Sequence, residues 1–197
     1  MRLGIFGGSF DPVHNGHLAL ARACQRQAAL DEVWFMPTAV QPFKHEGPHA
    51  TDTQRIEMLR LAIQSEPAWR VSTLEIDRGG TSYSVDTLRQ LNDELPHAVL
   101  FFLMGADAVS DAPHWREPQI IFSLATPLVV RRAGQREPVL DNLRTLCAAN
   151  KQPQLVEMPA IEVSSTEIRR RAAAGKSLDD LVPTAVSSYI IAKVLYR

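Results

Sequence analysis

Residues 7–17, GGSFDPVHNGH, decide the fold expected of this chain. They follow a short apolar run, Leu3–Phe6, and precede a helical pattern of apolar residues from Leu18 to Ala23. The order is therefore strand, glycine turn, loop and helix start. In a parallel α/β sheet this junction lies at the carboxyl end of a strand, where ligands bind. A helix that begins there directs free backbone N–H groups into the crevice, so the stretch predicts an anion site, in the first place for nucleotide phosphates.

The composition is that of an ordinary globular chain, with 197 residues, 45% apolar and 22% charged. A net charge of −1 gives no indication of a nucleic-acid or membrane partner. The two cysteines, Cys24 and Cys147, form no CxxC pair and predict neither a disulfide framework nor a zinc site. No signal-peptide pattern and no run of about 20 apolar residues is found. We therefore expect one cytoplasmic domain, residues 1–197, and leave homo-oligomer formation open.

Strands and helices alternate along the chain. Strands are predicted at residues 3–6, 32–36, 69–74, 98–104, 124–130 and 155–158. Helices are predicted at 16–29, from a capping box at 51–54 through 63, from 85 to before Pro96, at 139–149, from 164 onward and at 184–194. This alternation predicts an α/β fold with a doubly wound parallel sheet, which brings the loops after its strands to one edge.

Two familiar nucleotide-binding motifs do not fit. A dehydrogenase needs G-x-G-x-x-G after the first strand, but the glycines fall at 4, 7, 8 and 16, and the second strand ends without an acidic residue. Gly175-Lys176-Ser177 resembles the end of a P-loop, but Arg170 occupies the position of its first glycine. A metal site on His14 and His17 is disfavoured because no third ligand stands nearby in the sequence.

A second candidate anion site begins at Ser164, in the stretch SSTEIR of residues 164–169. Ser164 and Glu167 have the spacing of a capping box, which is a purely structural feature. Capping and phosphate binding both need a helix N-terminus with small hydroxyl side chains. Arg169 favours the phosphate interpretation, because its guanidinium can bind two phosphate oxygens at once.

Other candidate residues keep two interpretations each. Lys44 lies in a long loop, residues 38–50, and either faces solvent or contacts a phosphate. Asp107 follows a strongly apolar strand and serves as a helix N-cap, a ribose ligand or a metal ligand. Trp115 belongs to the core or stacks on a base or pyridine ring. Arg131-Arg132 form a solvated face or part of a phosphate pocket.

The pair of motifs HNGH (14–17) and SSTEIR (164–169) resembles the H-x-G-H and I-S-S-T-x-x-R signatures of the nucleotidylyltransferase superfamily. Within it, the chain closely resembles the bacterial nicotinate-nucleotide adenylyltransferase family. The resemblance extends over essentially the whole chain and includes the following segments: GGSFDPVHNGH at 7–17, SYS at 82–84 with DTL at 86–88, GAD at 105–107, Trp115, Arg131-Arg132 and the closing LVP at 181–183 with Tyr189-Ile190 and Leu195-Tyr196. It implies a Rossmann-like nucleotidylyltransferase fold.

The resemblance also implies an activity: adenylyl transfer from ATP to nicotinate mononucleotide, giving deamido-NAD and pyrophosphate. It implies catalytic roles for His14, His17, Lys44 and Arg169, with His17 at the α-phosphate and the histidines donating most strongly when protonated. ATP-binding residues are expected at Gly7, Gly8, Ser9, Phe10, Gly16, Gly105, Asp107, Arg132, Ser164, Ser165 and Thr166. Residues that bind the acceptor nucleotide are expected at Tyr83, Ser84, Trp115 and Arg116. Mg²⁺ is expected to accompany ATP, mostly coordinated by water, with no protein ligand named.

Three departures from the family pattern are small: Val163 replaces isoleucine, Ser84 replaces threonine, and Arg116 stands where an aromatic residue is common. The last two border the implied nicotinate pocket. Two other functions stay open. One is a related enzyme acting on nicotinamide mononucleotide, phosphopantetheine or glycerol phosphate, although residues 160–163 lack the R-T-E-G-I of the cytidylyl branch. The other is a nucleotide-binding module without catalytic activity.

Overall fold

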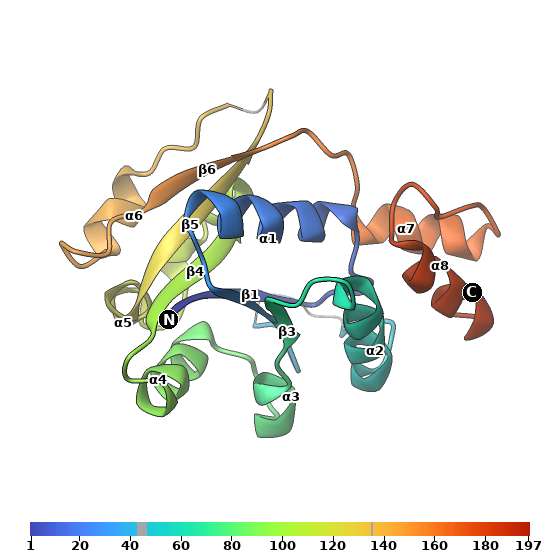
Figure 1. The fold of residues 1–197 in the computed structure, drawn as a ribbon, viewed down its shortest axis with the longest axis horizontal. Coiled ribbons are helices and arrows are strands. Elements are labelled where there is room, and N and C mark those ends of the chain that lie inside the picture. Colours follow the sequence, from blue (N-terminus) through green and yellow to red (C-terminus); the bar gives the residue numbers. More distant parts are fainter. Residues whose placement is uncertain (43–46, 135) are drawn as a thin grey trace.

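Six parallel strands form one sheet in the order β3-β2-β1-β4-β5-β6. In this computed structural model, the structure is described for residues 1–42, 47–134 and 136–197 (Figure 1). The strands are β1 (Arg2–Gly8), β2 (Glu32–Pro37), β3 (Trp69–Val71), β4 (Val99–Gly105), β5 (Ala125–Arg132) and β6 (Gln154–Met158). The strand order reverses direction between β1 and β4, which makes this point the ligand-binding crevice of a doubly wound sheet.

Helices cover both faces of the sheet. They are α1 (Asn15–Gln27), α2 (Asp52–Ile63), α3 (Leu74–Arg78), α4 (Ser84–Glu94), α5 (Pro118–Leu124), α6 (Asp141–Leu146), α7 (Ser165–Ala173) and α8 (Thr184–Ala192), with short 3-10 turns η1 (Ala106–Ala108) and η2 (Ala112–His114). Figure 1 shows α1 on one side of the sheet and α4 and α5 on the other, with α7 and α8 together at one end. The predicted doubly wound α/β fold is thus confirmed.

The apolar strand β4 shows why the sheet is buried on both faces. Leu100, Phe102 and Met104 pack in the core beneath α4 and α5. Phe101 and Leu103 point the opposite way, into the core that contains the α1 side chains. This alternation follows from the two-residue period of a strand. Because both faces are covered, the sequence of the strand is continuously apolar, as in other parallel sheets.

The third strand differs from the sequence prediction. It ends at Val71 rather than at residue 74, and Leu74 begins α3, which the sequence did not predict. β3 is an edge strand paired only with β2, so fewer ladder hydrogen bonds extend it. The Thr73 hydroxyl donates to the Asp77 carboxylate at 2.6 Å, a local contact that accompanies the turn into the helix.

A second unpredicted helix, α5, precedes β5. Pro118 occupies its first turn, where the missing N–H of proline costs nothing, and Glu117 before it has a left-handed φ of 50°. The apolar residues of this short helix, Ile121 and Phe122, are buried and gave no helical period over only seven residues. The remaining predicted helices are confirmed with shifted ends. The helix predicted at 139–149 spans only Asp141–Leu146, and the last helix ends at Ala192.

Candidate active site

The loop between β1 and α1 starts at Ser9, and its next residue, Phe10, packs in the core beneath the loop. This side chain is 1% exposed and lies 5.0 Å from the His17 ring and 5.4 Å from the Phe6 ring, between ring centroids. Its φ of 46° turns the chain in the left-handed region. The side chain of Phe10 therefore belongs to the core, and a contact with ATP, as the sequence suggested, stays a prediction for this residue.

The two histidines of the H-x-G-H motif stack on each other at the start of α1. Their ring centroids are 3.6 Å apart and the rings are inclined by only 16°. Nδ1 of His14, the N-cap residue, accepts the backbone N–H of His17 at 3.3 Å, and Nδ1 of His17 accepts the backbone N–H of His14 at 3.2 Å. A nitrogen that accepts a hydrogen bond carries no hydrogen, so these contacts assign the hydrogen of each neutral ring to Nε2.

Both imidazoles are neutral at pH 7 in this structure. Burial, with a further contribution from the positive charge of Arg132, lowers the pKa of His14 to about 4. Burial also lowers the pKa of His17 well below its ordinary range, and His14 and Arg132 add to the effect. Nε2–H of the neutral ring is already a donor in this state of the site. The expectation that the histidines donate most strongly when protonated stays a prediction, and we expect bound phosphates to raise both pKa values.

Gly16 is required by packing at the same helix start. A Cβ atom at this position would lie 2.9 Å from Cγ1 of Val163 and 3.1 Å from Nδ1 of His14. The glycine therefore lets the chain before α7 approach the histidine pair closely. Gly7 is different, since among the described residues, its two chain neighbours aside, no atom lies within 4 Å of a Cβ built there, and Gly7 lines a cavity described below.

The N-terminus of α7 is built as the sequence suggested, in part. Ser164 is the N-cap residue and its hydroxyl accepts the backbone N–H of Glu167 at 3.2 Å. The reciprocal half of the predicted capping box is not formed, because the Glu167 carboxylate instead accepts from Arg170 at 2.7 Å and Arg171 at 2.9 Å. These two ion pairs lower the pKa of Glu167 to about 2. The Glu167 side chain therefore does not cap the helix, and the first backbone N–H groups of α7 remain available as donors at the helix N-terminus.

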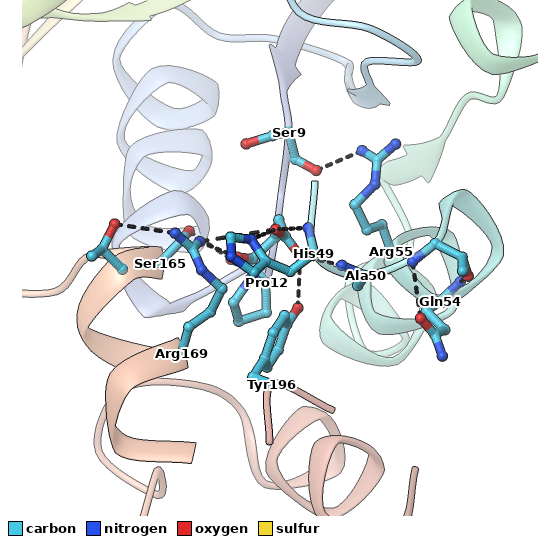
Figure 2. Close-up of polar contacts among 12 residues, drawn as sticks. Ser9, Pro12, His49, Ala50, Gln54, Arg55, Ser165, Arg169 and Tyr196 are labelled. Atoms are coloured by element: carbon cyan, nitrogen blue, oxygen red, sulfur yellow. Dashed lines mark hydrogen bonds and ion pairs between the residues drawn. The ribbon is translucent and has the colours of Figure 1, made fainter. Parts of the chain in front are cut away.

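Two residues of the second motif bind the first motif directly (Figure 2). Arg169 donates from Nη1 to the carbonyl oxygen of Asp11 at 2.7 Å, and Ser165 donates from Oγ to that of Pro12 at 3.0 Å. The other terminal nitrogen of Arg169 donates to the Thr166 hydroxyl at 3.3 Å. The two helix starts, about 150 residues apart in the sequence, are thus one unit in space.

A cavity of about 670 Å³ lies between these helix starts. It is lined by Ser9, Asp11, His17, Thr38, Val40, Gln41, Gly47, Pro48, His49, Ser165, Thr166 and Arg169. The predicted site residues Ser9, His17, Ser165, Thr166 and Arg169 are therefore brought together. His14 is 6% exposed and is not among the described residues of the lining. Its ring instead stacks on the ring of His17, which does line the cavity.

Two polar residues that hold this cavity in place were missed by the sequence analysis. The buried Asp11 carboxylate accepts the backbone N–H groups of His49 at 2.7 Å and Ala50 at 3.1 Å. Arg55, fully buried, donates to the carbonyl oxygens of Ser9 and Thr38, each at 2.6 Å. Figure 2 shows Arg55 reaching from α2 to Ser9. The one sequence signal for Arg55 is its position four residues before Leu59, which places both side chains on the same side of the predicted helix.

A second, smaller cavity of about 310 Å³ lies over the carboxyl ends of β1 and β4. All four predicted acceptor-binding residues line it: Tyr83, Ser84, Trp115 and Arg116, together with Gly7, Gly8 and Gly105. Thr38 and Gln41 line both cavities, so the two cavities adjoin at the residues after β2. A ligand in each would therefore meet its neighbour near this point.

Aromatic groups form one end of the smaller cavity. The Trp115 ring lies 5.7 Å from the Phe102 ring and 6.1 Å from the Phe122 ring, between centroids. The Arg116 guanidinium carbon is 4.7 Å from the centre of the Tyr83 ring, and Arg116 also pairs with Asp86 at 3.4 Å. Trp115 is thus partly packed in the core and also lines the cavity, and its stacking on a base or pyridine ring stays a prediction.

Three other predicted residues have different placements. Asp107 is exposed within η1 and is not an N-cap, since Gly105 holds that position; among the described residues it lines neither cavity. Arg132 ends β5, and its charge acts on both histidines. Lys44 lies outside the described residues. Within the described ranges, no group of three or more His, Cys, Asp or Glu side chains could hold a metal ion. No helix among them is long and apolar enough to cross a membrane.

A doubly wound sheet with paired histidines at its switch point and an arginine-bearing second helix start defines a nucleotidyltransferase-type site. The cytidylyltransferase-like family model matches residues 5–171. The chain is 38% identical to a nicotinate-nucleotide adenylyltransferase of Bacillus subtilis, over 100% of this chain and 98% of that protein. It is 42% identical to a protein of Thermus thermophilus described as a probable nicotinate-nucleotide adenylyltransferase, with 100% of both chains covered. The chain belongs to the nicotinate-nucleotide adenylyltransferase family.

A solved structure supports the fold assignment. The nicotinic acid mononucleotide adenylyltransferase of Plasmodium falciparum, complexed with NaAD, superimposes with a TM-score of 0.80. The match covers 99% of this chain and 97% of that chain at 18% sequence identity. At this identity the likeness concerns the fold alone.

Proposed function

We propose that this protein transfers the adenylyl group of ATP to nicotinate mononucleotide, releasing pyrophosphate and forming deamido-NAD in NAD biosynthesis. The observation that carries the proposal is the pair of adjoining cavities. One is lined by His17 and Arg169 and suits a triphosphate, and the other is lined by Trp115 and suits a flat ring. Family membership agrees with the two substrates proposed.

In the proposed reaction an oxygen of the acceptor's 5′-phosphate attacks the α-phosphorus of ATP. A new P–O bond forms at the α-phosphorus. The bond from the α-phosphorus to the oxygen that bridges the α- and β-phosphates breaks, and pyrophosphate leaves with that oxygen. No covalent bond to the protein is required, so the protein contributes positioning and charge stabilisation. We assign the α-phosphate to Nε2–H of His17, since this hydrogen is available while Nδ1 is occupied.

The leaving pyrophosphate is assigned to the start of α7. Ser165, Thr166 and Arg169 line the larger cavity there, and a helix N-terminus favours negative charge. Arg169 is held by the Asp11 carbonyl, so part of its guanidinium is already oriented. Roles for Ser164, Arg132, Asp107 and Lys44 follow the family resemblance and remain part of the proposal.

The acceptor is assigned to the smaller cavity, with its pyridine ring beside Trp115 and Tyr83 and its phosphate toward Thr38 and Gln41. The N-terminus of α4 begins at Ser84, and its N-cap residue, Tyr83, makes no side-chain capping bond. Its first N–H groups therefore suit the carboxylate of nicotinate. If these backbone groups bind the ring substituent, serine in place of threonine at residue 84 has little effect.

Mg²⁺ fits this site only as an ion carried by ATP. The carboxylate nearest the phosphate cavity, Asp11, already accepts two backbone N–H groups and a tyrosine hydroxyl. We therefore assign the ion to phosphate oxygens and water, where it would neutralise phosphate charge.

The test is pyrophosphate release with ATP and each acceptor supplied separately: nicotinate mononucleotide, nicotinamide mononucleotide, phosphopantetheine and glycerol phosphate. We expect the highest kcat/KM with nicotinate mononucleotide. A higher value with another acceptor would replace the proposed substrate. Release with none of them, while ATP still binds, would favour a binding module without catalytic activity.

A further inference from the structure

A buried acid without an assigned role stands in the wall of the smaller cavity. Glu75, on the short helix α3, is only 5% exposed and lines this cavity with Tyr83 and Trp115. One of its carboxylate oxygens, Oε1, accepts the Thr87 hydroxyl at 2.7 Å. The other oxygen, Oε2, is buried and has no partner at hydrogen-bond geometry within the described part of the chain, although the Ser82 hydroxyl is close enough to the carboxyl group to help lower its pKa. A buried carboxylate oxygen left without a partner is costly unless a ligand supplies the missing partner.

No described charged side chain forms a hydrogen bond with Oε2 of Glu75, so a ligand in the cavity can supply its partner. Arg78, on the same helix, acts through Thr87, to whose hydroxyl it donates at 2.8 Å. Among the described residues, the other charged side chains that line the cavity are Asp111, which is exposed, and Arg116. The Arg116 side chain is half-exposed and is shared among the Asp86 carboxylate at 3.4 Å, the Glu117 carboxylate at 3.8 Å and the Tyr83 ring. Within the part of the lining that the structure describes, Glu75 is therefore the buried charged group, and it is negative when ionised.

The chemistry of the acceptor supplies the matching charge. In a pyridine mononucleotide the N-glycosidic bond makes the ring nitrogen quaternary, so the ring is a pyridinium cation. We propose that Glu75 is the counter-ion of this pyridinium ring. The inference rests on the proposed function and deepens it: the cavity selects a cationic ring, in addition to the ring's carboxylate substituent.

Three features agree with this assignment. Trp115 and Tyr83 line the cavity, and the ring electrons of aromatic side chains attract a cation. The start of α4 at Ser84 offers the opposite partial charge for the ring's own carboxylate, so a zwitterionic ring meets both signs. Burial raises the pKa of Glu75 above its ordinary range, and the hydroxyls of Thr87 and Ser82 and the charge of Arg78 offset part of the increase. A bound cation would stabilise the ionised carboxylate further.

The experiment compares a charged ring with a neutral one. Nicotinate mononucleotide is paired with the C-nucleotide in which a 3-carboxyphenyl group replaces the pyridinium ring. Dissociation constants and kcat/KM are measured for the wild type, Glu75→Gln and Asp77→Asn. The glutamine keeps an acceptor for Thr87 but has no charge. Asp77→Asn removes one charge from an exposed position of the same helix.

We expect Glu75→Gln to weaken binding of the pyridinium ligand roughly 10- to 100-fold, as for the loss of a hydrogen-bonded charge. Binding of the phenyl analogue and the KM for ATP should stay within about twofold, and Asp77→Asn should resemble the wild type. Equal loss for both rings, or no loss for either, would overturn the counter-ion assignment while wild-type turnover remains. Absence of wild-type turnover with nicotinate mononucleotide would instead overturn the proposed function.

A measurement on the wild type covers the case in which Glu75→Gln does not fold. Binding of each ligand is followed by calorimetry at about pH 5.5, just above the ordinary carboxyl range, in two buffers of different ionisation enthalpy. The pyridinium ligand should release more protons than the phenyl analogue, because it lowers the pKa of Glu75. Both ligands carry the same phosphate, and the carboxyl group of each ring is almost fully ionised at this pH, so the difference reports the ring charge. Equal proton release would contradict the proposal.

Discussion

The hydroxyl of Tyr196 donates a hydrogen bond of 2.9 Å to Oδ1 of Asp11, across 185 residues of sequence. Figure 2 shows the hydroxyl of Tyr196 pointing toward the segment of His49 and Ala50, whose backbone N–H groups donate to the same carboxylate. Burial and the neighbouring Asp11 charge raise the pKa of Tyr196, so it remains a donor at any physiological pH. The same aspartate holds Arg169 through its carbonyl oxygen. The last turn of the chain is therefore joined to the proposed phosphate site.

We predict that Tyr196→Phe lowers the free energy of unfolding by about 2 kcal/mol, the usual value for a hydrogen bond to a charged group. The KM for ATP should rise more than kcat falls, because Arg169 and residues 49–50 lose a common support. Urea unfolding and steady-state kinetics measure the two effects. Tyr189→Phe, at the other tyrosine of the C-terminal segment, is the control and should change neither. A wild-type KM for ATP in Tyr196→Phe would show that the contact serves stability alone.

Replacing His17 by alanine should reduce kcat on the order of 100- to 1000-fold, as expected for removal of one donor to a developing charge. The circular dichroism spectrum should be unchanged. Stability should fall by only about 1 kcal/mol, since one half of the helix cap is lost. The exposed His97→Ala is the matched control. Retained turnover in His17→Ala would remove this residue from the proposed mechanism.

Acidification should destabilise the protein through the histidine pair. The pKa of His14 is about 4 in the folded state against 6.5 for a free side chain. Between these two pH values, His14 of the unfolded chain is protonated and His14 of the folded chain is not. The free energy of unfolding should therefore fall as pH drops from 6.5 to 4, by about 3 kcal/mol for this residue. Urea titrations across this range measure the slope.

The variant His14→Asn separates this effect from others, because asparagine is a good N-cap but does not titrate. The pH slope should be smaller in this variant, with the remainder due to His17. An unchanged slope would mean that His14 does not carry the linkage.

Two glycines of the first motif should respond differently to alanine. Gly16→Ala places a Cβ atom 2.9 Å from Val163, so it should lower the melting temperature as well as the activity. In Gly7→Ala the added Cβ meets no atom within 4 Å in the described part of the chain beyond its two neighbours, so this variant should fold normally. Because Gly7 lines the smaller cavity, its added methyl should raise the KM for the acceptor. Thermal melts and kinetics together distinguish the cases, and a large loss of stability in Gly7→Ala would contradict the prediction.

Trp115→Leu should raise the KM for nicotinate mononucleotide roughly three- to tenfold, which corresponds to loss of an aromatic stacking contact. The KM for ATP should be unaffected, since Trp115 lines only the smaller of the two cavities among the described residues. Trp115→Phe keeps an aromatic face and should lie between the two. A larger change for ATP than for the acceptor would reverse the assignment of the cavities.

The sequence by itself determined the features that depend on neighbouring residues. The apolar run of β4, the glycine turn before α1, the capping box at Thr51 and the helix start at Ser164 all follow from local patterns. The short helices α3 and α5 were not predicted, because five to seven residues are too few to establish a helical period.

Only the tertiary structure decided how distant polar groups meet. Two contacts, of Asp11 with Tyr196 and of Arg55 with the Ser9 carbonyl, join residues whose spacing in the sequence follows no period. The same holds for the residues that line the smaller cavity with Glu75. Their contacts depend on how helices pack against the sheet. The protonation of the histidine pair was decided in the same way, because the pKa depends on burial and on the charge of Arg132, and both exist only after folding.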